Sequence, residues 1–100
     1  MTFEQNIARI QEWAQNAGIY EHSSVQAQVL KSVSEMGELA DAVIKGDLPA
    51  AEDAYGDVIV CLVNAAYMQG IDISDALAKV TDIVTDRKGR MVEGGAFMKD

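Results

Sequence analysis

Four acidic side chains in the middle of the chain have the types and the spacing of a metal-binding site. Glu35 and Glu38 are three residues apart, and Asp53 and Asp57 are four residues apart, so on helices each pair projects from one face. Carboxylates that gather in one place repel one another unless a cation neutralises them, and oxygen-only ligands suit Mg²⁺. The pattern therefore indicates a site where Mg²⁺ engages phosphate oxygens while Glu35 or Glu38 orients an attacking water.

A second interpretation of these acids needs no metal. Acidic residues in the first turn of a helix, such as Glu52 and Asp53, favour the helix dipole whatever the function, and Asp41 pairs with Lys45 at a spacing common on helix surfaces. Asp57 fits this interpretation less well, because it enters an apolar run directly and a charge at that boundary needs a partner. From spacing alone, a metal site and solvated helix faces both stay open.

Basic residues gather at the other end of the chain. The sequence has 16 Asp and Glu against 8 Lys and Arg, yet five of the 8 bases lie from Lys79 onward. The net charge of −8 makes sequence-independent binding to a nucleic-acid polymer unfavourable, whereas a basic segment can supply cations to the phosphate groups of a substrate. We expect phosphate contacts from Lys79, Arg87 and Lys88, with Lys31 as a weaker candidate.

Four segments with helical periodicity position these residues. Each contains apolar residues at intervals of three or four and begins or ends at a capping residue. The turn between the second and third segments is short, so these helices should pack antiparallel and bring the two carboxylate pairs to a similar depth. The expected helices run from Thr2 to Gly18, from Ser23 to Gly46, from Pro49 to Gln69, and from Asp72 or Ser74 to about Lys88.

The expected architecture is all-α. The β-branched run from Val58 to Val63 could form a strand on local propensity, but flanking alanines and the lack of other strand candidates favour a helix. Residues 89–100 contain too much glycine to continue the last helix and should form an extended arm. The sequence predicts one domain, residues 1–100, with an antiparallel four-helix bundle-like subunit and a Gly-rich C-terminal arm.

Other sources of chemistry receive little support. Cys61 lies within the apolar run and is interpreted as a buried thiol, while His22 lies beside a helix cap without a nucleophile nearby. Zinc spacings, a phosphate-binding glycine loop and a dinucleotide fingerprint are absent from the sequence. Without a secretory signal or a long apolar stretch, we expect a cytoplasmic protein that does not bind membranes.

The acidic motifs and the basic tail together resemble the MazG-like members of the all-α nucleoside triphosphate pyrophosphohydrolases, especially the short phage-type members. That family carries Glu-Glu-x-x-Glu on one helix and Glu-x-x-Asp on the next. The matching stretches are Ser34-Glu35-Met36-Gly37-Glu38-Leu39 and Asp53-Ala54-Tyr55-Gly56-Asp57-Val58, followed by the tail elements Asp86-Arg87-Lys88-Gly89-Arg90-Met91 and Phe97-Met98-Lys99-Asp100.

The resemblance implies an enzyme. It implies Mg²⁺-dependent cleavage of a (deoxy)nucleoside triphosphate between its α and β phosphates, giving a monophosphate and pyrophosphate, in a homodimer or homotetramer whose helices complete the site. Glu35, Glu38 and Asp57 match the family's ligands. Ser34 and Ala54 stand where the family has glutamate, and Asp53, one residue from Ala54, is the expected substitute. These departures leave two alternatives open: a non-catalytic nucleotide-binding relative and a helical oligomerisation protein.

Overall fold

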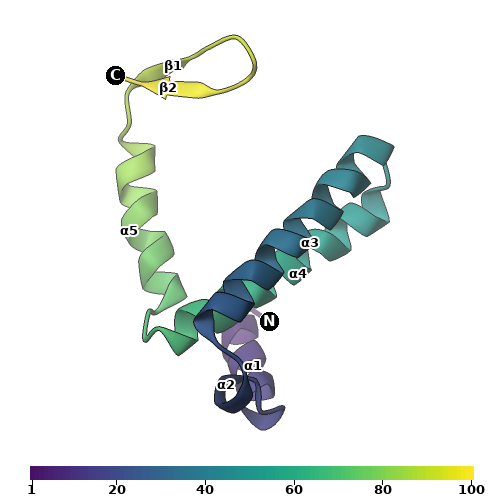
Figure 1. The fold of residues 1–100 in the computed structure, drawn as a ribbon. Coiled ribbons are helices and arrows are strands. Elements are labelled where there is room, and N and C mark those ends of the chain that lie inside the picture. Colours follow the sequence, from purple (N-terminus) through teal and green to yellow (C-terminus); the bar gives the residue numbers. More distant parts are fainter.

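The protein is described here from a computed structural model of residues 1–100, which contains five helices and one short β-hairpin (Figure 1). The all-α prediction is confirmed, and the apolar run that follows Asp57 lies within a helix. The elements are α1 (Phe3–Asn16), α2 (Ile19–His22), α3 (Val25–Lys45), α4 (Leu48–Met68), α5 (Ile73–Thr85), β1 (Gly89–Met91) and β2 (Phe97–Lys99).

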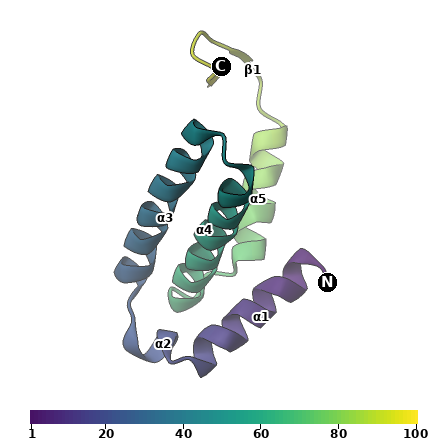
Figure 2. The same ribbon diagram turned by 90° about the vertical axis from the view of Figure 1, so that its right-hand side faces the viewer.

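Helix boundaries follow capping residues. Thr2 and Gln5 form the expected capping box at the start of α1, since each side chain accepts a hydrogen bond from the other's backbone N–H. Gly46 ends α3 with a φ of 71°, a left-handed conformation that favours glycine, and Asp47 caps α4 one residue later. This tight turn reverses the chain, so α3 and α4 lie side by side and antiparallel (Figure 2).

Small side chains fill the seam between α3 and α4. Leu39 and Ala42 of α3 form a buried cluster with Ala51 and Ala54 of α4. Alanines at these positions allow the two helix backbones to approach closely. The acidic side chains of the two helices lie along the edges of the seam. The α3–α4 hairpin is therefore the packed unit that carries the acidic residues of the candidate site.

The N-terminal third of the chain covers one end of this hairpin. The short helix α2 was not expected from the sequence, and α3 is capped by Ser24 rather than by Ser23. Ser23 instead accepts a hydrogen bond from the amide of Gln28 at 3.0 Å, so the expected boundary was wrong by one residue. Helix α1 packs against α4, and Ile7 and Ala14 are its buried residues.

Helix α5 projects away from the rest of the molecule. Asp72, one of the two expected caps, begins this helix. The helix axis turns 107° from that of α4, so α5 and the α3–α4 hairpin form the two arms of a V (Figure 1). No residue of α5 is buried, and both strands beyond it are exposed. The expected C-terminal arm thus forms an antiparallel hairpin in which Arg90 pairs with Met98. The radius of gyration is 15.9 Å, against about 13 Å for a compact domain of this length.

Only the combination of α4 and α5 has the length and apolar composition of a membrane span, and these helices are strongly bent against each other. No single helix has both properties.

Candidate active site

Residues from α3 and α4 meet along one edge of the seam. Lys31, Glu35 and Glu38 are spaced by four and three residues, which places them on one side of α3. Asp57 and Cys61 are one turn apart on α4, and their positions along the antiparallel helix place them opposite the α3 residues. The charges of Glu38, Asp57 and Lys31 all affect the pKa of Glu35, as expected for side chains that lie close together.

Glu35 is the carboxyl of this group whose pKa is clearly raised. Its Oε2 atom is buried and has no hydrogen-bond partner in the chain. A hydrogen bond to Glu38 raises the pKa of Glu35, burial and the charges of Glu38 and Asp57 raise it further, and Lys31 acts in the opposite direction. That hydrogen bond requires a proton on one of the two carboxyls, so in the fully ionised pair Oε2 has no donor. The site therefore holds a desolvated oxygen that a cation or a water would satisfy.

An acidic hollow continues from this point toward the turn between α3 and α4. It has a volume of about 290 Å³, and Glu38 from α3 and Asp53 and Asp57 from α4 line it. Asp53 and Asp57 also line a second hollow of about 480 Å³ on the outer side of α4. Three of the four expected metal-ligating carboxylates thus share one cavity, and Glu35 stands beside it. The other lining residues of the first hollow are Asp41, Ala42, Lys45, Asp47, Ala50 and Ala54.

The two departures from the family motif have different structural settings. Ala54, which stands where the family has glutamate, is 4% exposed and packs in the seam with Leu39. Asp53 is exposed and faces the acidic hollow together with Asp57. A carboxylate at position 53 can therefore reach the hollow while the seam stays apolar. Ser34 is exposed on α3 and does not line the hollow.

The donor set fits a hard divalent cation. All the candidate ligands are carboxylates, and the orphaned oxygen of Glu35 is the kind of atom that a cation satisfies. No three Asp, Glu, His or Cys side chains converge closely enough within the single chain to enclose a metal ion. The assignment of Glu35, Glu38, Asp53 and Asp57 as metal ligands therefore stays a prediction.

Lys31 and Cys61 border the same site. Burial raises the pKa of the Cys61 thiol, Lys31 lowers it, and the charges of Glu35 and Asp57 raise it again. Cys61 is buried and unpaired, as expected for a packing residue, and its neutral thiol adds no charge to the acidic group. Of the basic residues expected to contact phosphate, Lys31 is the one that lies near the carboxylates.

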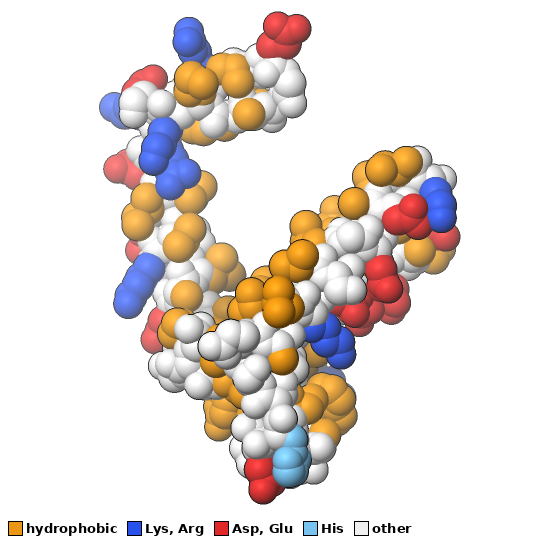
Figure 3. Space-filling model, viewed as in Figure 1, with side chains coloured by type: hydrophobic (Ala, Val, Ile, Leu, Met, Phe, Trp, Pro, Cys, Tyr) orange, Lys and Arg blue, Asp and Glu red, His pale blue; other side chains and the backbone are white.

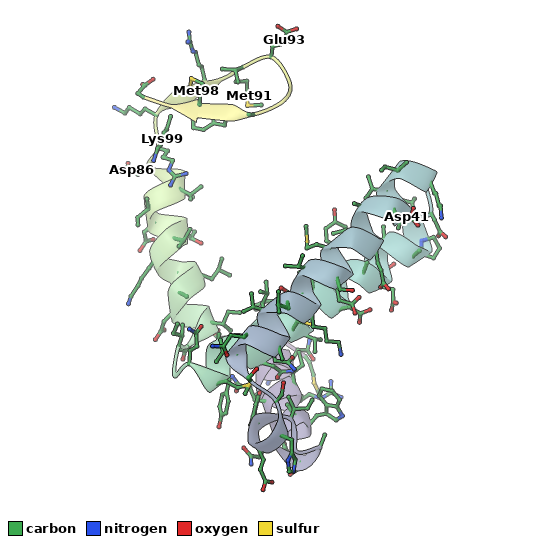
Figure 4. All side chains as sticks on the ribbon, in the orientation of Figure 1. Asp41, Asp86, Met91, Glu93, Met98 and Lys99 are labelled. Carbon is green, nitrogen blue, oxygen red and sulfur yellow. The ribbon has the colours of Figure 1, made fainter.

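The other expected phosphate contacts lie on the opposite arm of the V. Lys79 belongs to α5, and Arg87 and Lys88 lie between α5 and β1. Figure 3 shows acidic side chains gathered on one side of the α3–α4 hairpin, while basic side chains stand along α5 and its hairpin. In Figure 4, Asp41 near the tip of one arm and Asp86 at the end of the other are widely separated. The single chain does not bring these bases to the carboxylates.

Sequence reasoning missed a buried polar pair beneath the site. Asn64 lies seven residues after Asp57 on α4, is 2% exposed, and accepts a hydrogen bond of 2.8 Å from the hydroxyl of Tyr20. Tyr20 also stacks on Tyr67 with ring centroids 4.4 Å apart, so both aromatic residues contribute to packing. The available signal was a lone asparagine inside an apolar helix, because a buried amide needs a partner.

Comparison of the sequence with known proteins identifies its family. The sequence profile of the MazG nucleotide pyrophosphohydrolase domain matches residues 23–92, which include α3, α4, α5 and β1. The chain is also 35% identical over 69 residues to an uncharacterized 18.2 kDa protein in the rep-hol intergenic region of Haemophilus phage HP1 (strain HP1c1). That match covers 69% of this chain and 42% of the phage protein. No solved structure matches significantly. The chain therefore belongs to the MazG nucleotide pyrophosphohydrolase domain family.

Proposed function

We propose that the protein is a Mg²⁺-dependent nucleotide pyrophosphohydrolase that converts a (deoxy)nucleoside triphosphate and water to a monophosphate and pyrophosphate. The observation that carries this proposal is the buried, unpartnered Oε2 of Glu35 beside Glu38 and Asp57. Burying such an oxygen is costly unless a ligand satisfies it, so its position favours a functional site over a solvated helix face.

Glu35, Glu38 and Asp57 would hold the metal, and Asp53 would support them from the acidic hollow. When bound, Mg²⁺ supplies electrostatic stabilisation to phosphate oxygens and lowers the pKa of a bound water. Glu35 or Glu38 orients the attacking water and accepts its proton, and the raised pKa of Glu35 suits that residue to the role. The water oxygen forms a bond to phosphorus as the bond between the α and β phosphates breaks, and pyrophosphate leaves.

The charge of the departing group needs cations besides the metal. Lys31 is placed to supply one, because it lies on the same side of α3 as Glu35. Lys79, Arg87 and Lys88 would serve from a second copy of the chain, since their own copy holds them on the other arm of the V. The proposed active form is therefore a homodimer or a homotetramer.

The test is pyrophosphate release by the full chain with each common NTP and dNTP, with Mg²⁺ and with EDTA. We expect Mg²⁺-dependent release from at least one nucleotide. Glu38→Gln and Asp57→Asn should abolish it without changing helicity, as measured by circular dichroism. Glu12→Gln on α1 and Asp82→Asn on α5 make the same chemical changes away from the hollow and should leave release unchanged. Activity in both site variants equal to the unmodified chain contradicts the assignment.

A non-catalytic nucleotide-binding relative is the second candidate, and the structure gives it one specific support. Ala54 is built into the seam, so the family's glutamate is absent there and Asp53 alone stands in for it. Titration calorimetry separates the two functions. Nucleotide binding without Mg²⁺-dependent pyrophosphate release supports the non-catalytic relative. If the protein serves only in helical oligomerisation, we expect neither nucleotide binding nor thermal stabilisation by Mg²⁺ with a non-hydrolysable triphosphate.

A further inference from the structure

Two hollows between α1 and α5 form a groove that shares no lining residue with the acidic hollow. The larger, of about 750 Å³, lies where α1 faces the turn between α4 and α5. The smaller, of about 420 Å³, continues along α5. Both are lined by Glu4 of α1 and Ser74 of α5, so they form one surface, the α1–α5 groove. Figure 2 shows α1 and the start of α5 on the same side of α4.

Apolar side chains line the α1–α5 groove along both helices. Ile7, one of the buried residues of α1, lines the larger hollow. Large apolar side chains on α1, on α4, in the turn and on α5 are exposed to solvent beside it. These residues are Phe3, Tyr67, Ile71 and Leu77. An exposed apolar strip along a groove between two helices is a surface that an amphipathic helix of another protein buries.

The carboxylates at the α1–α5 groove are not paired with a cation. Glu4, Asp72 and Asp75 line the larger hollow, and no lysine, arginine or histidine lines either hollow. Arg9, the one basic residue of α1, lines neither of them, and the two ion pairs of the chain lie elsewhere. The groove therefore combines an apolar surface with an uncompensated negative potential.

Local roles explain why acidic residues occur at these positions. Glu4 and Asp75 lie in the first turns of their helices, where they favour the helix dipole, and Asp72 accepts a hydrogen bond of 3.1 Å from the backbone N–H of Asp75. Those roles do not require that both helix starts face one apolar groove without a base between them. The resulting potential repels the phosphates of nucleic acids and of anionic membranes, and it favours a cationic protein partner.

We propose that the α1–α5 groove docks a basic amphipathic helix of a partner protein. Apolar side chains of that helix, spaced by three and four residues, would contact Ile71 and Leu77. Lysines or arginines beside them would pair with Glu4 and Asp75. Charge complementarity selects this partner, because the groove has carboxylates and apolar residues but no cation of its own. Such docking goes beyond nucleotide hydrolysis and does not require it.

The probe for this surface is a synthetic amphipathic peptide of about 18 residues, with leucines along one face and lysines on either side of them. Its control has the same leucines and a glutamate in place of every lysine. Titration calorimetry with the full unmodified chain should show binding of the lysine peptide, with a dissociation constant that rises with salt, and no binding of the glutamate peptide. Equal binding of the two peptides, or no binding of the lysine peptide, overturns the proposal.

Matched charge variants locate the binding surface. Glu4→Gln/Asp75→Asn should weaken binding of the lysine peptide by about tenfold, because two charge pairs are lost. Glu12→Gln/Glu93→Gln removes the same net charge outside the groove and should change the dissociation constant by less than about twofold. Equal loss of binding in the two double variants overturns the proposal.

The apolar contribution has its own pair of variants. Ile71→Ser/Leu77→Ser should weaken binding of the lysine peptide by about tenfold. Ile44→Ser/Leu48→Ser replaces the same residue types at exposed positions near the turn between α3 and α4, and it should leave binding unchanged. Circular dichroism of the variants should match that of the unmodified chain, because every substituted side chain is exposed.

Amide chemical shifts of the unmodified chain decide between surfaces. Docking in the groove predicts that the lysine peptide shifts the resonances of Ala8, Gln11 and Gly70, while those of Asp53 and Asp57 stay in place. Shifts confined to the acidic hollow overturn the proposal. A chain that binds the peptide in the groove but releases no pyrophosphate contradicts the proposed enzyme and leaves the docking site supported.

Discussion

The hydroxyl of Tyr20 donates a hydrogen bond of 2.8 Å to Oδ1 of Asn64, a residue 44 positions later in the chain. The bond joins the short helix α2 to the buried side of α4, two turns from Asp57. Burial, and to a smaller extent the neighbouring Tyr67, raise the pKa of the Tyr20 hydroxyl, which further favours the protonated form that donates this bond. A polar contact thereby holds the C-terminal part of α4, the helix that carries Asp57.

Tyr20→Phe should destabilise the fold. The substitution keeps the ring that stacks on Tyr67 but leaves Oδ1 of Asn64 buried without a donor, which costs about 1–3 kcal/mol. For a domain of this size each 1 kcal/mol lowers Tm by roughly 4–8 °C, which differential scanning calorimetry resolves. Tyr55→Phe is the matched control, because Tyr55 is exposed and its hydroxyl makes no hydrogen bond within the chain. Equal Tm values for the two variants would show that the Tyr20 bond contributes nothing.

Glu35→Gln should stabilise the metal-free protein while abolishing pyrophosphate release. The neutral amide removes the repulsion from Glu38 and Asp57 and can itself donate a hydrogen bond to Glu38. Thermal unfolding in EDTA at neutral pH should show a higher Tm for Glu35→Gln than for the unmodified chain. Glu12→Gln, the same change on the exposed side of α1, should leave Tm unchanged.

The same substitution has a defined pH signature. Because the pKa of Glu35 is raised in the folded chain, the folded state binds this proton more tightly than the unfolded state does. The penalty from Glu35 is therefore full at neutral pH and is relieved as pH falls through the raised folded value toward the ordinary glutamate pKa. The Tm advantage of Glu35→Gln should shrink over that interval. An advantage that grows on acidification contradicts the electrostatic explanation.

Asp53→Asn should weaken metal use more than Glu52→Gln does. Asp53 lines the acidic hollow with Glu38 and Asp57, whereas the adjacent Glu52 does not. Losing a supporting carboxylate should raise the Mg²⁺ concentration for half-maximal pyrophosphate release by about tenfold. A titration of initial rates against Mg²⁺ measures this for both variants. If Glu52→Gln shifts the titration as far as Asp53→Asn, the effect is one of net charge and not of position.

Gly89→Ala should open the C-terminal hairpin. A Cβ at position 89 would collide with the backbone carbonyl of Met98 and the ring of Phe97, and it would lie 2.9 Å from the Cα of Lys99. Amide exchange of β1 and β2 should therefore accelerate, while circular dichroism of the helices is retained. Gly37→Ala is the control, because a Cβ there meets no atom within 4 Å and alanine favours a helix interior. An unchanged hairpin in Gly89→Ala would contradict the close contact.

The parts of the fold that depend on local chemistry were predictable from sequence. The capping box at Thr2 and the left-handed Gly46 defined two helix ends, because each depends on a few adjacent residues, and the start of α5 was predicted as Asp72 or Ser74. Adjacent serines were less informative, since Ser23 and Ser24 have the same capping chemistry and tertiary contacts select between them. The direction of α5 could not be predicted either, because no local signal sets an interhelix angle of 107°.

The candidate site was predictable to a similar degree. Residue spacing and the short turn at Gly46 placed Glu38 and Asp57 together at one cavity. The role of Ala54 required the structure, because its sequence position matches a ligand of the family while its side chain lies in the seam. Lys79, Arg87 and Lys88 lie on α5 or just beyond it, on the other arm of the V from the carboxylates, and sequence spacing contains no information on that separation.

The alanines of the α3–α4 seam set the distance between the acidic side chains on either side of it. Ala42, Ala51 and Ala54 set how closely the two helix axes approach, and the same separation fixes the gap between the carboxylates of α3 and those of α4. Mg²⁺ prefers ligand distances of about 2.0–2.1 Å and Ca²⁺ about 2.3–2.6 Å. A larger side chain in the seam would widen that gap, so at the proposed metal site the preference for one ionic radius over another would depend on residues that do not contact the ion.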